Sequence, residues 1–146
     1  ELRRLGRIER KGAPDTFDAT GYIALLRRLR AANESVRAPA FDRGREETIA
    51  DAIDVPRATS LVITEGNYLL LDDEPWCRVR EIVAEVWFID HPRRVEWLVA
   101  RHVSHGHDPA DAYTRATTGS DGDNARLITM GRDRADLVLA HGWLTS

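Results

Sequence analysis

The stretch from Leu61 to Asp73, LVITEGNYLLLDD, places the strongest constraint on how this chain can fold. Four apolar or β-branched residues lead into the turn residues Glu65-Gly66-Asn67, and a second apolar run begins at Tyr68. A short run that is apolar on both alternating faces predicts a strand, over about residues 60–65, buried inside a parallel sheet. Glu65 would then stand at the C-terminal end of the strand, at the sheet edge where ligands bind. Position alone equally allows Glu65 to end a strand beside a turn.

Helix and strand patterns alternate along the rest of the chain. Apolar residues at helical spacing predict an amphipathic helix over about residues 19–32, with Asp18 as its N-cap. The other expected elements are helices over 79–84, 92–106, 109–117 and 125–134, a polar turn over 119–124, a hairpin formed by 36–42 and 48–55, and short strands over 85–90 and 135–140. Such alternation indicates an α/β fold with a mostly parallel sheet.

Composition narrows the functional classes. The 21 Lys and Arg residues are outnumbered by 24 Asp and Glu, so a net charge of −3 gives no overall basic surface for nucleic acid. The single cysteine, Cys77, excludes an internal disulfide and a cysteine-based zinc site, and no apolar run has the length of a membrane span. We therefore expect a cytoplasmic protein without nucleic-acid or membrane partners. The charged residues that follow Glu1, with no strand before them, suggest a sequence that starts inside a longer chain.

Carboxylates at strand ends combine with arginines on the helix that follows. Glu65 and Asp90 end two predicted strands, and Arg93, Arg94 and Arg101 lie just beyond the second. Phosphoryl transfer uses these residue types, since a carboxylate can hold Mg²⁺ and cations can neutralise the transferring oxygens. Without a phosphate loop in the sequence, this pattern on its own is a weak indication of a kinase.

The histidines in RHVSHGHD offer a different hypothesis, a metal-dependent hydrolase. His102 and His105 stand three residues apart on a predicted helix, and Asp108 would be the third ligand. The chain has no HExxH pattern, and Gly106 is expected to end the helix before His107. We interpret these histidines as exposed polar positions and keep the hydrolase as an alternative.

Several segments, taken in order, resemble P-loop small-molecule kinases of the uridine kinase, phosphoribulokinase and bacterial pantothenate kinase superfamily. The nearest branch is the bacterial nucleoside/nucleotide kinase family, often described as fructokinase-like. The segments are RKGAPDTFD from Arg10, APAFDR from Ala38, LVITEGNYLLLDD from Leu61, EVWFID from Glu85, ARHVSHGHDPADA from Ala100, SDGDNARLI from Ser120 and RADLVL from Arg134. The resemblance implies one α/β domain over residues 1–146, a three-layer α/β/α sandwich with a parallel sheet, lacking its N-terminal P-loop unit and carrying a helical lid around 95–130.

The resemblance also implies roles for individual residues. Glu65 matches the acidic residue of the Mg²⁺ and phosphate site, and Arg101 resembles a lid arginine that reaches the nucleotide phosphates. Asp18 matches a residue that could accept hydrogen bonds from substrate hydroxyls, which competes with its N-cap role. The other matching positions are Phe17, Phe41, Asp42 and Arg43 at the acceptor pocket, and Asn124 and Arg126 near the nucleotide.

The main departure from the family is that no GxxxxGK[ST] motif occurs in the chain, nor does the Asp-Gly-Phe-His segment whose Asp resembles the general base. The chain alone should therefore have negligible kinase activity. For the complete protein we expect phosphorylation, dependent on ATP and Mg²⁺, of a hydroxyl on a nucleoside, sugar or pantothenate-like metabolite. The alternative is a non-catalytic fragment or degenerate paralogue that binds a nucleotide or a partner. A homodimer is compatible with the sequence, which does not fix the oligomeric state.

Overall fold

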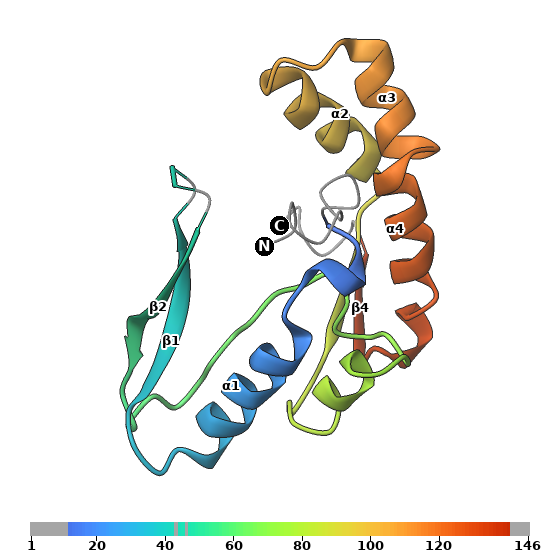
Figure 1. Cartoon of the computed structure of the whole chain (residues 1–146). Helices are drawn as coiled ribbons and strands as arrows, with labels where there is room; N and C mark the ends of the chain where they lie inside the picture. Colours follow the sequence, from blue (N-terminus) through green and yellow to red (C-terminus); the bar gives the residue numbers. More distant parts are fainter. Residues whose placement is uncertain (1–11, 43, 46, 141–146) are drawn as a thin grey trace.

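The computed structural model of this chain describes residues 12–42, 44–45 and 47–140. Figure 1 shows a hairpin at one end, a bundle of helices at the other, and a long helix and a parallel strand pair between them. The main elements are α1 (Ala19–Ala31), β1 (Val36–Asp42), β2 (Glu47–Val55), β3 (Trp87–Asp90), α2 (Arg94–Ser104), α3 (Pro109–Thr117), α4 (Ser120–Thr129) and β4 (Leu137–Ala140). Short 3₁₀ helices cover Pro14–Thr16, Trp76–Val79 and Arg132–Arg134. No helix in the described part of the chain is both long and apolar enough to cross a membrane.

Helix α1 begins where the sequence predicts. The Asp18 carboxylate accepts a hydrogen bond from the Gly21 backbone N–H at 2.9 Å, which satisfies a donor that the first turn leaves unpaired. A Cβ at Gly21 would lie 2.3 Å from Asp18 Oδ2, so glycine leaves room for this cap. The helix ends at Ala32, which adopts a left-handed conformation with φ of 46°. The predicted helix and its N-cap are both confirmed.

The hydrophobic core lies between α1 and residues 68–82. Its buried members are Ala19, Ile23, Leu26, Tyr68, Leu71, Trp76, Val79 and Ile82. Arg134 ties the Tyr68–Leu71 turn to the end of the helical region, because its Nε donates to the Leu70 carbonyl at 2.9 Å and its Nη1 to Asp72 Oδ2 at 2.6 Å. The turn that follows Gly66 is therefore fixed both by apolar burial and by an arginine.

The strands form two separate pairs. β1 and β2 are antiparallel, as the predicted hairpin requires, with Val36 opposite Val55. The register shifts between Ala38 and Ala40. β3 and β4 are parallel, with Trp87 opposite Leu137. The predicted strands at 85–90 and 135–140 are thus confirmed in shorter form, and their pairing is the parallel part of an α/β fold.

Residues 60–65, predicted as a buried central strand, form no strand in the structure. The side chains of Leu61 and Ile63 are 71% and 85% exposed. A strand requires hydrogen bonds to a neighbouring strand, and none of the described residues pairs with this segment. β3, expected to be buried, does form a strand with β4, but this sheet has only two strands among the described residues and leaves Trp87 and Ile89 exposed. The prediction of a buried strand here is wrong for this structure.

Two other boundaries differ from the prediction. The helix expected over 79–84 is instead the 3₁₀ helix Trp76–Val79 followed by turns. The polar turn expected over 119–124 is in fact the start of α4, which ends at Thr129. Small polar and acidic residues favour a helix N-terminus as well as a turn, because carboxylates in the first turn interact favourably with the helix dipole. Asp121 and Asp123 occupy that first turn.

Candidate functional site

The loop that leads into α1 is held on a cluster of aromatic rings. The Phe17 ring meets the rings of Tyr68 and Trp76 edge-on, with centroids 5.8 Å and 6.3 Å away. Trp76 Nε1 donates to the Pro14 carbonyl at 3.4 Å, and the Tyr68 hydroxyl donates to the Gly12 carbonyl. Phe17 nevertheless stays 52% exposed. The cluster therefore holds the loop in place and leaves Phe17 partly exposed to solvent, where an acceptor substrate could contact it.

Glu65 lies beside the same aromatic cluster. Tyr22 packs against Trp76 with ring centroids 6.2 Å apart, and its hydroxyl lies 2.9 Å from Thr64 Oγ1. Burial raises the pKa of Tyr22, the hydrogen bond to Thr64 opposes this, and the nearby charge of Glu65 raises the pKa further. Glu65 itself is exposed and makes no ion pair within the described part of the chain. Glu65 thus lies near Tyr22, which packs against the same tryptophan, Trp76, as Phe17 does.

The oxygen atoms at Thr64 and Glu65 fit the chemistry of Mg²⁺. Magnesium is commonly held by one or two carboxylates together with substrate phosphates and water, so a single exposed carboxylate is compatible with it. The Thr64 hydroxyl and the Glu65 carboxylate are neighbours in the chain, and the hydroxyl is oriented by Tyr22. Glu65 could hold the ion directly or through water.

The geometry gives no support to the metal-dependent hydrolase. In the described ranges, no group of three His, Cys, Asp or Glu side chains is placed to hold a metal ion. The Asp108 carboxylate caps α3 by accepting from the Ala110 N–H at 2.8 Å. His102, interpreted as exposed, is largely buried and bonds Asp121 instead.

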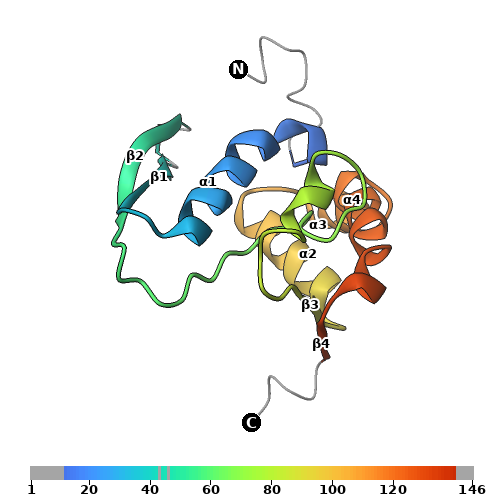
Figure 2. The same ribbon diagram turned by 90° about the horizontal axis from the view of Figure 1, so that it is seen from below.

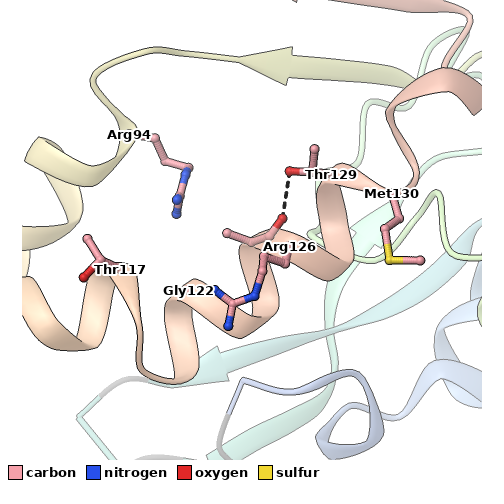
Figure 3. A pocket seen from close by; sticks show the side chains of 7 residues that line it. Arg94, Thr117, Gly122, Arg126, Thr129 and Met130 are labelled. Carbon is pink, nitrogen blue, oxygen red and sulfur yellow. Dashed lines mark hydrogen bonds between the residues drawn. The ribbon is translucent and has the colours of Figure 1, made fainter.

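An open pocket of about 410 Å³ lies among the three helices after β3. Figure 3 shows Arg94 from the start of α2 and Arg126 from α4 on its two sides. The other lining residues are Thr117, Gly122, Ala125, Thr129 and Met130. Arg126 pairs with Asp123, whereas Arg94 has no ion pair among the described residues. The size is typical of small-molecule sites, and two guanidinium groups would favour an anionic ligand.

The other predicted lid residues lie near this pocket or on the same helices. Arg126 lines the pocket, and Asn124 lies in α4 one turn from its start. Arg101 is exposed on α2 and makes no side-chain ion pair within the described part of the chain. Asp90, expected to work with these arginines, is paired with Arg132 at 3.3 Å. Within the described residues, Arg101 is therefore left without an ion pair, whereas Arg126 is paired with Asp123 and Asp90 with Arg132.

The hairpin carries the remaining acceptor-site predictions. Phe41 is 57% exposed near the end of β1. The Asp42 carboxylate accepts hydrogen bonds from the backbone N–H groups of Gly44 at 2.8 Å and Arg45 at 3.1 Å, so it stabilises the hairpin turn. Arg43 lies outside the described residues. The roles proposed for Phe41, Asp42 and Arg43 at the acceptor site remain predictions.

Sequence reasoning missed Thr117 and Met130. These two pocket residues come from the end of α3 and the end of α4. Neither belongs to a recognisable motif, and only the packing of three helices brings them together. Arg94 could be found from the sequence as a cation following a strand end, but its position opposite Arg126 could not.

Comparison with known proteins gives the family. The chain is 37% identical over 111 residues to the ATP-dependent kinase-like protein notR' of Aspergillus versicolor, a match that covers 72% of this chain and 64% of that protein. It therefore spans less than two thirds of the relative's length. No protein-family profile matches the chain.

Two solved structures share the fold. A "putative fructose transport system kinase" from Silicibacter sp. TM1040 is 38% identical, with a TM-score of 0.78 over 94% of this chain and 66% of that one. YFH7 from Saccharomyces cerevisiae, described as "a putative P-loop containing kinase with a circular permutation", is 21% identical, with a TM-score of 0.73 over 96% and 51% of the two chains. At that identity the yeast protein supports the fold alone. Taken together with the fungal relative, these similarities show that the chain belongs to the P-loop kinase superfamily and has its α/β fold.

Proposed function

We propose that the complete protein transfers the γ-phosphoryl group of ATP to a hydroxyl of a small metabolite, such as a nucleoside, a sugar or a pantothenate-like compound. One observation carries the proposal: the aromatic cluster around Trp76 joins the loop bearing Phe17 and Asp18 to the segment bearing Glu65. An acceptor on that loop would therefore lie close to the carboxylate. The named ATP-dependent relative supports the same reaction class.

Each part of the site has a task in this reaction. Mg²⁺, when bound, would neutralise charge on the phosphates, and Glu65 would hold it directly or through water. Arg94 and Arg126 face one pocket and can bind phosphate oxygens, with Arg101 on the same helix as Arg94. Phe17 would contact the acceptor, and closure of the helices over the site would exclude the water that competes with it.

We expect activity from the complete protein only. This chain contains no GxxxxGK[ST] sequence, whose backbone N–H groups and lysine bind the β- and γ-phosphates in P-loop kinases. We therefore expect negligible transfer by the 146-residue chain alone.

The substitution Glu65→Gln tests the proposal. In the complete protein we expect turnover to fall by about a hundredfold or more, because the metal loses its carboxylate, whereas the exposed position should leave the melting temperature unchanged. Turnover would be measured as ADP release with a panel of nucleosides, sugars and pantothenate. Asp73→Asn, at another exposed acid without an ion pair in the described residues, is the matched control. Unchanged turnover in the Glu65 variant would remove that residue from the mechanism.

A further inference from the structure

His102 and Asp121 form a largely buried polar pair that the proposed chemistry does not use. His102 Nε2 lies 2.6 Å from Asp121 Oδ2, and the two side chains are only 13% and 24% exposed. A carboxylate oxygen accepts hydrogen bonds, so the ring nitrogen is the donor. The His107 ring packs edge-on against the His102 ring at 5.4 Å and closes its other side. The short contact and the low exposure indicate a fixed arrangement rather than a passing surface contact.

The pair joins two helices that carry the candidate phosphate ligands. His102 lies in the last turn of α2, and Asp121 lies in the first turn of α4, where a carboxylate is favoured by the helix dipole. Among the described residues it is the one hydrogen bond between these two helices. Arg94 and Arg101 belong to α2, and Arg126 belongs to α4. The pair is therefore a direct link between the helices that carry these arginines, beside the packing of both helices on α3.

The contact between α3 and α4 is of a different kind, because it involves the backbone. A Cβ at Gly122 would lie 2.1 Å from the Thr117 carbonyl oxygen, so α4 begins in direct contact with the end of α3. That contact sets α4 against α3 through the backbone and places no constraint of its own on α2. α2 also packs against α3, and the hydrogen bond between His102 and Asp121 is the direct side-chain link from α2 to α4 among the described residues.

The charge of Asp121 also acts on Tyr68. Burial raises the pKa of Tyr68, and the charges of Asp121 and Asp15 raise it further. Tyr68 packs against Phe17 and bonds the loop that leads to it. The carboxylate that bonds α2 thus also acts electrostatically on the ring that supports the acceptor loop.

We propose that His102 and Asp121 act as a positioning clamp that holds α2 against α4, so that Arg94, Arg101 and Arg126 converge on the phosphates of the bound nucleotide. Neither clamp residue touches the reacting atoms. The inference rests on the proposed kinase function for its ligand, but the clamp itself is a property of the helices and can be measured without substrate.

The kinetic test uses the complete protein with His102→Ala, Asp121→Ala and the double variant. We expect each single change to raise the KM for ATP about tenfold, in line with the loss of a hydrogen bond to a charged group, with a smaller effect on kcat. The double variant should be no worse than either single one, because the two side chains act as a unit. His102→Gln keeps an amide donor and should restore most of the affinity. His105→Ala, on the exposed residue that follows α2, is the control and should leave the KM unchanged.

Additive effects in the double variant, or an unchanged KM in the single variants, would overturn the clamp. Amide hydrogen exchange of residues 94–104 and 120–129 separates its failure from that of the proposed function. If the wild-type protein transfers no phosphate, the kinase proposal fails, and faster exchange in both helices of His102→Ala but not of His102→Gln still supports the clamp. Unchanged exchange in His102→Ala would reject it whatever the activity.

Discussion

The region around α1 and the region of α2 to α4 are held together by different means. Around α1, large apolar and aromatic side chains are buried, with Tyr68 2% exposed and Val79 fully buried. In the helical region, α2 buries no residue, α3 buries only Ala112 and Ala116, and α4 buries only Gly122. Figure 2 shows the first region next to the hairpin and the second as a group of helices beyond it.

The difference is compatible with a division of tasks in the proposed reaction. A region with many buried apolar contacts opens rarely, whereas one held by small residues and a polar pair can move at low cost. The acceptor loop and Glu65 are attached to the first region, and the arginines of the pocket belong to the second. A rigid acceptor platform and a movable lid are what a kinase needs to enclose two substrates and then release two products.

The largest expected effect comes from removing one tryptophan from each region. Trp76→Ala should lower the free energy of unfolding by about 3–5 kcal/mol, because it leaves a cavity among packed rings. Trp97→Ala should cost about 1 kcal/mol or less, since that ring is 52% exposed and packs mainly by stacking on His91. Urea unfolding followed by far-ultraviolet circular dichroism measures both. Equal losses of stability would show that the two regions do not differ in the way their burial suggests.

A smaller effect is expected where helix packing in the lid relies on glycine. Gly122→Ala should destabilise the protein by about 1–3 kcal/mol, because the added methyl group would meet the Thr117 carbonyl oxygen and push α4 from α3. Gly44→Ala is the control for the general effect of replacing glycine: a Cβ there meets only the Asp42 side chain at 3.3 Å, and the change should be neutral or slightly stabilising. Thermal unfolding compares the two variants. A stable Gly122 variant would mean that the helices can separate without loss.

The first region was largely predictable from the sequence because its signals are local. Asp18 and the spacing of Ile23 and Leu26 lie within one helix, and the structure confirms that helix from cap to end. The strand predicted over 60–65 is wrong because a strand is defined by its neighbour, and sequence periodicity does not reveal whether the neighbour is present. The family and its fold were found because several motifs occur together in order, a signal that no single motif carries.

The region of α2 to α4 was predictable as helices, but the pocket between these helices was not. His102 was interpreted as an exposed residue because its partner, Asp121, lies 19 residues further on and in another helix. The pocket lined by Arg94 and Arg126 likewise arises from three helices. Its size and lining follow from the angles at which these helices pack, which the spacing of residues in the sequence does not reveal. The role of Glu65 is a prediction that the Glu65→Gln variant addresses, and the roles of Arg101 and the acceptor residues remain predictions.

The smallest expected effect concerns two phenols that report on the junction of the regions. The pKa values of Tyr22 and Tyr68 are both raised above the usual 10.0, chiefly by burial. The folded protein therefore binds these protons more tightly than the unfolded chain does. The resulting stabilisation is fully present below the unfolded pKa and is lost as the pH rises through the folded values. Tyr22→Phe and Tyr68→Phe should each flatten this alkaline loss of stability.

The charges near the two phenols differ, and this allows each region to be probed separately. Glu65 raises the pKa of Tyr22, whereas Asp121 raises that of Tyr68. Glu65→Gln should therefore lower the pKa of Tyr22 alone, and Asp121→Asn that of Tyr68 alone, because removing a negative neighbour makes the phenolate easier to form. Ultraviolet absorbance of tyrosinate against pH, with the Tyr→Phe variants for assignment, measures both values. If Asp121→Asn left the Tyr68 titration unchanged, the charge of Asp121 would not act on this phenol, and the two regions would be electrostatically independent at this junction.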